Sequence, residues 1–97
     1  MFEELGLEIG KLVKEKDESY GQSFSQAHKI LSVLYPNGIR VDQYTDVLAT
    51  IRIIDKLFRI ANNKEAFNEE PFKDISGYGM LGVANERSNQ KIHERNA

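Results

Sequence analysis

The sequence predicts an all-α protein: a single, four-helix bundle-like domain. Four segments repeat apolar residues at spacings of three and four, which is typical of one face of a helix. No convincing run alternates apolar and polar residues as a half-buried strand does. The 97 residues suffice for one domain with one modest core. Because small helical proteins often gain stability by associating, we also expect a homo-oligomer.

The first helix is predicted over about residues 2 to 19, and the second begins at Ser23. Gly21 lies between them and suits a left-handed cap that ends the first helix. The segment from Ser23 to Gln26 matches the capping-box pattern, in which a serine precedes a glutamine by three residues. The apolar positions of the first helix are Phe2, Leu5, Ile9, Leu12, Val13 and Tyr20.

The third helix is predicted from an N-cap at Asp42 to about Ala61, as the central helix of the bundle. At 100° per residue it divides into a wide apolar half and a narrow polar arc. The apolar half holds Val47, Ile51, Ile54, Leu57, Phe58 and Ala61. The polar arc holds Thr45, Arg52, Asp55, Lys56, Arg59 and Asn63.

The fourth helix is predicted to begin at Pro71, because the first turn of a helix tolerates the missing N–H of proline. Its apolar face contains Phe72, Ile75, Gly79, Gly82 and Val83. The two glycines predict that a neighbouring backbone approaches closely. We therefore expect a helical domain over residues 1–86 and a polar, frayed C-terminal tail over residues 87–97.

Composition excludes several classes of function. The net charge of −2, with acids and bases interspersed, argues against a non-specific nucleic-acid binder. The absence of cysteine excludes disulfides, thiol catalysis and cysteine-ligated zinc. The sequence shows neither a signal peptide nor an apolar run of the roughly 20 residues that span a bilayer, so we expect a cytoplasmic protein with no membrane partner.

The polar arc of the third helix is the first candidate site. Arg52, Lys56 and Arg59 surround Asp55 at spacings of three and four, which brings them to one helix face. Guanidinium groups bind phosphate oxygens in a two-pronged fork, and lysine adds a point charge. Asp55 would hold an arginine in place or coordinate a metal. The alternative interpretation is a solvated face with weak ion pairs.

Two tyrosines and a second aspartate extend this candidate site. Tyr20, at the turn before the second helix, would stack on a base or else anchor the core. Asp74 and Tyr78 share an edge of the fourth helix, where Asp74 would bind a metal, pair with an arginine or favour the helix dipole. The predicted ligand-binding residues are Arg52, Lys56, Arg59, Tyr20 and Tyr78. The predicted metal ligands are Asp55 and Asp74, with magnesium as the metal.

Three short blocks carry a family resemblance. They are Asp-x-x-Tyr-Gly at residues 17–21, Asp…Lys-Leu-x-Arg at residues 46–59, and Asp-x-x-Gly-Tyr at residues 74–78. Together they resemble small all-α phage and prophage proteins of the nucleotide-modification-associated group and, more distantly, MazG-like nucleotide pyrophosphohydrolases. The resemblance covers about residues 14–84 and implies a helical, oligomeric scaffold with a nucleotide-type ligand. The MazG-like Glu-Glu-x-x-Glu motif is absent, since Glu3 and Glu4 are followed by Glu8.

Three functions follow as hypotheses. The leading one is a phage-type protein that binds or sequesters a nucleotide, acting on the nucleotide pool or on a nucleotide signal. The first alternative is a magnesium-dependent, MazG-like nucleoside triphosphate pyrophosphohydrolase. The second is a non-enzymatic protein-interaction module, such as a phage-encoded inhibitor of a host protein. Whether the protein is an enzyme stays open, and the missing acidic motif favours binding.

Overall fold

The computed structural model describes the backbone of residues 1–96 and their side chains except those of residues 66 and 93–96. Over this range the regular elements are four α-helices: α1 Phe2–Ser19, α2 Ser23–Leu34, α3 Tyr44–Asn63 and α4 Pro71–Asn96. Short 3₁₀ turns at Val41–Gln43 and Ala66–Asn68 precede α3 and α4. The predicted all-α fold with four helices is confirmed. None of the helices in the described range is long and apolar enough to cross a membrane.

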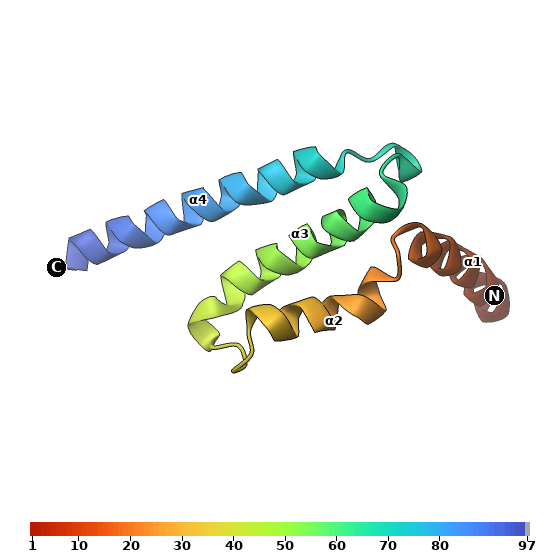
Figure 1. The fold of residues 1–97 in the computed structure, drawn as a ribbon, viewed down its shortest axis with the longest axis horizontal. Helices are drawn as coiled ribbons and strands as arrows, with labels where there is room; N and C mark the ends of the chain where they lie inside the picture. The colour runs from red at the N-terminus through yellow and green to blue at the C-terminus, as the bar shows by residue number, and fades with distance from the viewer. Residues whose placement is uncertain (97) are drawn as a thin grey trace.

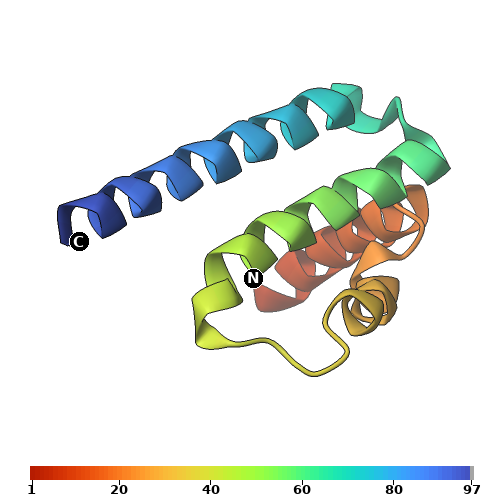
Figure 2. The same ribbon diagram turned by 60° about the vertical axis from the view of Figure 1, so that its left-hand side comes forward.

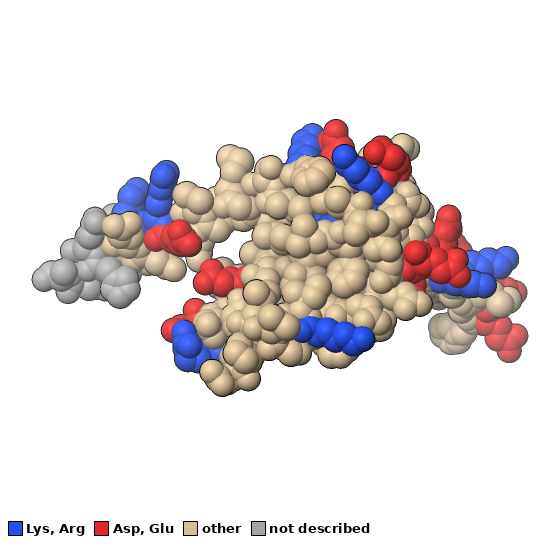
Figure 3. Space-filling view, viewed as in Figure 1, with Lys and Arg blue, Asp and Glu red and all other residues tan. Residues whose placement is uncertain are grey.

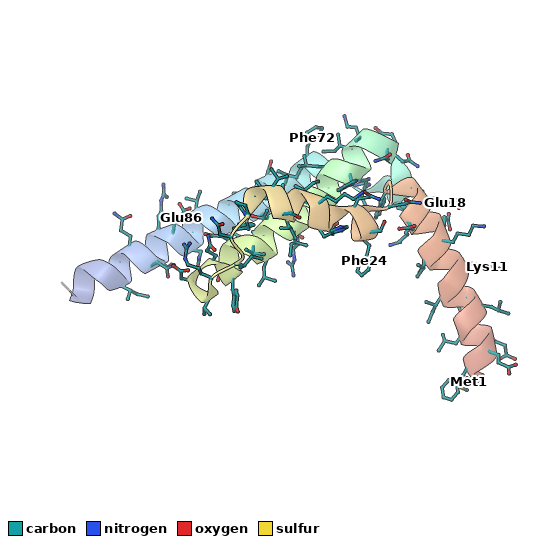
Figure 4. All side chains as sticks on the ribbon, turned by 60° about the horizontal axis from the view of Figure 1, so that its bottom comes forward. Met1, Lys11, Glu18, Phe24, Phe72 and Glu86 are labelled. Carbon is teal, nitrogen blue, oxygen red and sulfur yellow. The ribbon has the colours of Figure 1, made fainter. Side chains whose placement is uncertain are left out.

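The helices form an elongated array rather than a closed bundle. α3 lies between α2 and α4 and runs antiparallel to both (Figure 1). α1 points away from this layer at the end where α2 begins (Figure 4), and the second half of α4 extends beyond the layer at the opposite end (Figures 1 and 2). The molecule measures 58 × 32 × 29 Å along its principal axes. Residues 1–15 of α1 are all exposed.

The core of the layer lies on α3. Val47 and Ile54, both in the predicted apolar half, are buried there. Leu57 of the same half remains 50% exposed, so the layer covers the apolar half of α3 only in part. Arg59, from the predicted polar arc, is only 1% exposed. The polar arc therefore faces α4 and its connecting loop in part, and not solvent alone.

The turn between α1 and α2 confirms one predicted cap and corrects another. Gly21 takes the predicted left-handed conformation, with φ of 66°, and the N–H of Gln22 donates to the carbonyl of Asp17 at 2.9 Å. Gln22 is also left-handed, with φ of 59°, and precedes α2 as its cap residue. Ser23 is thus already the first helical residue, and its side chain makes no capping hydrogen bond, so the predicted capping box is wrong.

The start of α3 also differs from its prediction. Asp42 lies within the 3₁₀ turn, where its carboxylate accepts a hydrogen bond from Arg40 Nε at 3.1 Å. Gln43 is the residue that precedes α3, and its side-chain oxygen accepts a hydrogen bond from the N–H of Arg40 at 3.0 Å. Asp42 is therefore not the N-cap of α3. The pairing with Arg40 keeps its carboxylate in the turn.

The predicted apolar face of α4 is split by its packing. Ile75 and Gly82 are half-buried, whereas Phe72 and Val83 are exposed. A Cβ atom added at Gly79 or Gly82 would meet nothing within 4 Å, so the predicted close approach to these glycines is wrong for the described chain. α4 continues to Asn96, and the segment predicted as a frayed tail is therefore helical through residue 96. Residue 97 lies outside the described range.

Candidate functional site

The five predicted ligand-binding residues fall into two groups along the seam between α3 and α4. Tyr20, Lys56 and Arg59 meet around Glu69, in what we call the anchor cluster, which also includes Asp74. Arg52 and Tyr78 meet instead at a groove between α3 and α4. The groups adjoin, because Arg52 is one helical turn from Lys56 and Asp74 is one turn from Tyr78.

Arg59 is the centre of the anchor cluster and closes the loop between α3 and α4. Its Nη2 donates to the backbone carbonyl of Lys64 at 2.9 Å and to that of Glu69 at 2.6 Å. Its Nη1 lies 3.4 Å from Oε2 of the Glu69 carboxylate. A single guanidinium thus holds both ends of the loop, a task suited to its fixed fork of donors.

Lys56 and Tyr20 complete the cluster from two other segments. The Lys56 ammonium lies 3.3 Å from Oδ2 of Asp74 and 4.0 Å from Oε2 of Glu69. The Tyr20 hydroxyl donates to the Glu69 carboxylate, with both oxygens at 3.1 Å. The ring of Tyr20 also meets that of Phe67 edge to face, at 6.0 Å between centroids. The cations predicted to bind phosphate are here compensated by carboxylates of the same chain.

The surroundings of Tyr20 change its acidity. Partial burial raises the pKa of Tyr20 above its usual value of 10.0. The hydrogen bond to Glu69 and the negative charge of that carboxylate raise the pKa further, while the positive charge of Arg59 opposes them. The cluster therefore holds Tyr20 as a neutral hydrogen-bond donor at ordinary pH.

The groove lies beside the anchor cluster and has a volume of about 210 Å³. Its apolar lining comes from Leu48 and Ala49 of α3 and from Leu81 and Gly82 of α4. Its polar lining is Thr45, Asp46, Arg52, Tyr78 and Asn85. An apolar surface with a few convergent polar groups is the usual composition of a small-molecule site.

Arg52 is the predicted cation that faces this groove. Its side chain is exposed, and its Cζ lies 5.6 Å from the centroid of the Tyr78 ring. A cation over an aromatic face is attracted by the ring quadrupole, which gives the guanidinium a preferred position. The stacking leaves the edge of the guanidinium, where its N–H donors point, available to an acceptor.

The two predicted metal ligands, Asp55 and Asp74, have different surroundings. Asp74 pairs with Lys56, and Asp55 is half-buried on α3. Within the described residues, no group of three or more histidine, aspartate or glutamate side chains is arranged to hold a metal ion. The magnesium site therefore stays a prediction.

Sequence reasoning missed Glu69, which contacts Tyr20, Lys56 and Arg59. It lies in the polar connection before α4, where it looks like an ordinary loop acid. One signal could have found it: the pair of acids, Glu69 and Glu70, directly before the helix-starting Pro71, in a chain whose preceding helix ends with a cationic arc.

Comparisons with known proteins give no relative for this chain. No family model matches the sequence, no curated protein matches it, and no solved structure matches its fold. Function must therefore be argued from the site itself.

Proposed function

We propose that this protein binds a nucleotide in the α3–α4 groove, as a non-catalytic binder that acts on the nucleotide pool or on a nucleotide signal. The observation that carries the proposal is the exposed guanidinium of Arg52 over the ring of Tyr78 at this groove. The guanidinium would bind phosphate oxygens through parallel hydrogen bonds, and Tyr78 would contact the base or sugar. Lys56 lies one turn along α3, but Asp74 and Glu69 compensate its charge, so Arg52 would be the main cation of the site.

The anchor cluster supports this site indirectly. Arg59 and Tyr20 hold the α3–α4 loop through Glu69, and so fix the distance between the two helices that line the groove. The resemblance to small all-α phage proteins supports a nucleotide over other phosphate-bearing molecules. The anchor cluster therefore favours a binding groove that is preorganised before the ligand binds.

Binding is tested by calorimetry and thermal shift on the full chain, against nucleoside mono-, di- and triphosphates and cyclic nucleotides, with and without magnesium. Arg52→Ala should weaken binding about 10- to 100-fold, since hydrogen bonds to charged groups are worth about 1.5–3 kcal/mol. Arg40→Ala is the matched control, because Arg40 is likewise an exposed arginine and pairs with Asp42 away from the groove. Equal effects of the two variants, or unchanged binding in Arg52→Ala, would reject this site.

The hydrolase alternative rests on one observation: the carboxylates of Glu69 and Asp74 both approach Lys56, one turn from the groove. It requires magnesium, for which Asp55 and Asp74 are the predicted ligands. Consumption of a nucleoside triphosphate with release of pyrophosphate only in the presence of magnesium would replace the binder with the hydrolase. Asp74→Asn should then abolish release while nucleotide binding persists.

A protein-interaction module is the third possibility, and the exposed apolar surface favours it. Phe2 of α1 is 86% exposed and Phe24 of α2 is 94% exposed. Exposed apolar surface on this scale marks sites of association. This function predicts a host-protein complex and no affinity for nucleotides, so the same calorimetric screen distinguishes it from the proposed binder.

A further inference from the structure

α1 has an apolar stripe that nothing in the described chain covers. Phe2, Leu5, Ile9, Leu12 and Val13 share one side of the helix, and each is between 46% and 86% exposed. Gly6 and Gly10 weaken the helix, and an isolated helix of this length is only marginally stable in water. Figure 4 shows α1 pointing away from the other helices, with Met1 at its far end. Packing against a partner is the ordinary source of stability for such a helix.

The surface area of the chain gives the size of that partner contact. The accessible surface is 7995 Å², whereas a compact monomer of this mass exposes about 5,700 Å². The excess of about 2,300 Å² is well above the roughly 800 Å² that each partner buries in a standard interface. The radius of gyration, 17.4 Å, likewise exceeds the roughly 12.5 Å of a compact 97-residue domain. The excess surface of one chain is therefore large enough to form its half of a stable dimer interface.

The outer face of α4, turned away from α3, matches the α1 stripe in length. Phe72, Met80 and Val83 are exposed on it, and a shallow hollow of about 410 Å³ lies along Gly79, Met80, Val83, Ala84 and Arg87. Phe72 to Val83 spans about 17 Å of helix, as does Phe2 to Val13. The two faces are therefore equal in length and both apolar.

The charges that border the two faces are complementary. The α1 stripe is flanked along one edge by Glu4, Glu8 and Glu15. On α4, Lys73 and Arg87 lie seven residues before and after Met80, towards the two ends of the apolar face, and Lys73 also pairs with Glu70 at 3.2 Å. Glu4 and Glu15 lie about 17 Å apart along their helix, and Lys73 and Arg87 about 21 Å apart along theirs. Figure 3 shows the charged side chains mostly around the periphery of the view, beside a broad uncharged middle. The two separations differ by about 4 Å, less than one helical turn, so the opposite charges favour the contact without fixing its register.

We propose that α1 of each chain packs its apolar stripe on the outer face of α4 of a second copy, so that a dimer contains two such contacts. α1 and α4 of the same chain do not meet in this way, because α1 leaves the layer at the opposite end from the free half of α4 (Figures 1 and 2). The dimer is independent of the proposed nucleotide site. It adds an interaction surface and a partner to that function.

The dimer is tested by sedimentation velocity and light scattering of the full chain without nucleotide. The wild type should show twice the chain mass of 11.1 kDa. Leu12→Glu should raise the dimer dissociation constant at least about 30-fold, as expected when a charge replaces an apolar residue that the contact buries. Leu7→Glu is the matched control: it makes the same change at a 69% exposed leucine on the opposite side of α1. A monomeric wild type, or equal effects of the two variants, would overturn the proposal.

A second experiment tests which surface receives α1, and it does not depend on a destabilising variant. The chain has no cysteine, so introduced thiols report proximity without background. Leu12→Cys and Met80→Cys chains are mixed and oxidised under mild conditions. A disulfide between the two variants supports the α1–α4 contact. Disulfides only between two Leu12→Cys chains would mean that α1 pairs with its own copy, and would reject the contact with α4.

Discussion

Glu69 is the residue at which three segments of the chain are joined. Its carboxylate meets Tyr20 from the end of α1 and Lys56 and Arg59 from α3. The hydrogen bond from Tyr20 spans 49 positions in sequence, and no local pattern predicts a contact of that range. The cationic arc itself could be predicted, because helical spacing alone brings its members to one face. Which carboxylate compensates it depends on how the loop folds back.

Arg59 is expected to stabilise the fold rather than to bind a ligand directly. Arg59→Met removes a buried charge, leaves two loop carbonyls without this donor and removes one of the three partners of the Glu69 carboxylate. We expect the free energy of unfolding to fall by about 3 kcal/mol, the lower end for a broken buried pair, because Glu69 remains one-third exposed. Urea denaturation measures this, with Arg52→Met as the exposed control, for which the change should stay within about 0.5 kcal/mol. Similar losses in both variants would contradict the role assigned to Arg59.

Tyr20 makes a pH-dependent contribution to stability. Its pKa is raised in the folded state above 10.0, by burial first and then by Glu69. The neutral hydroxyl therefore stabilises the fold fully below the unfolded-state pKa, and this contribution is lost as the pH rises through the folded-state pKa. Wild-type stability should fall more steeply than that of Tyr20→Phe between about pH 9 and 11. Parallel pH profiles of the two proteins in chemical denaturation would show that Tyr20 does not titrate in this way.

Among the elements, the turn between α1 and α2 depends most clearly on one residue type. Gly21 has a positive φ of 66°, and a Cβ there would collide with the side-chain amide of Asn62, which itself donates to the carbonyl of Phe58. Gly21→Ala should therefore lower the free energy of unfolding by about 1–2 kcal/mol or more.

The matched control for this substitution is Gly77→Ala. Gly77 lies within α4, where an added Cβ meets nothing within 4 Å, so alanine should stabilise the helix by up to about 1 kcal/mol. Both variants are compared by denaturation at one protein concentration. Opposite signs for the two substitutions are the expected result, and a neutral or stabilising Gly21→Ala would show that α1 does not dock through this turn.

Most limits of the helices were predictable, whereas the end of α4 and the sides that the helices bury were not. Gly21, Pro36 and Pro71 act on their own neighbourhood, so the limits of α1 and α2 and the start of α4 follow from local chemistry. The covered side of α4 depends on where α3 lies, and this left Phe72 and Val83 exposed against expectation. The predicted capping box at Ser23 was wrong for a different, local reason. One extra left-handed residue, Gln22, precedes the helix, so Ser23 is its first residue and not its cap.

For the whole molecule, periodicity predicted the class of fold but not its arrangement. An amphipathic stripe such as that of α1 predicts that something covers it, without saying whether the cover belongs to the same chain. The expected bundle placed that cover within one chain, whereas α1 stands apart from the layer of α2, α3 and α4. The large accessible surface is the observation from which we infer that a second chain covers this stripe.

The turn at Gly21 and Gln22 also determines the direction of α1 relative to the layer of α2, α3 and α4. α1 is about 27 Å long, so a rotation of about 30° at this turn moves its tip by about 14 Å. A head-to-tail contact closes into a ring only at particular angles between its two surfaces, and at other angles it propagates without end. In the proposed dimer, the conformation of Gly21 and Gln22 would therefore decide whether the two α1–α4 contacts close on one another.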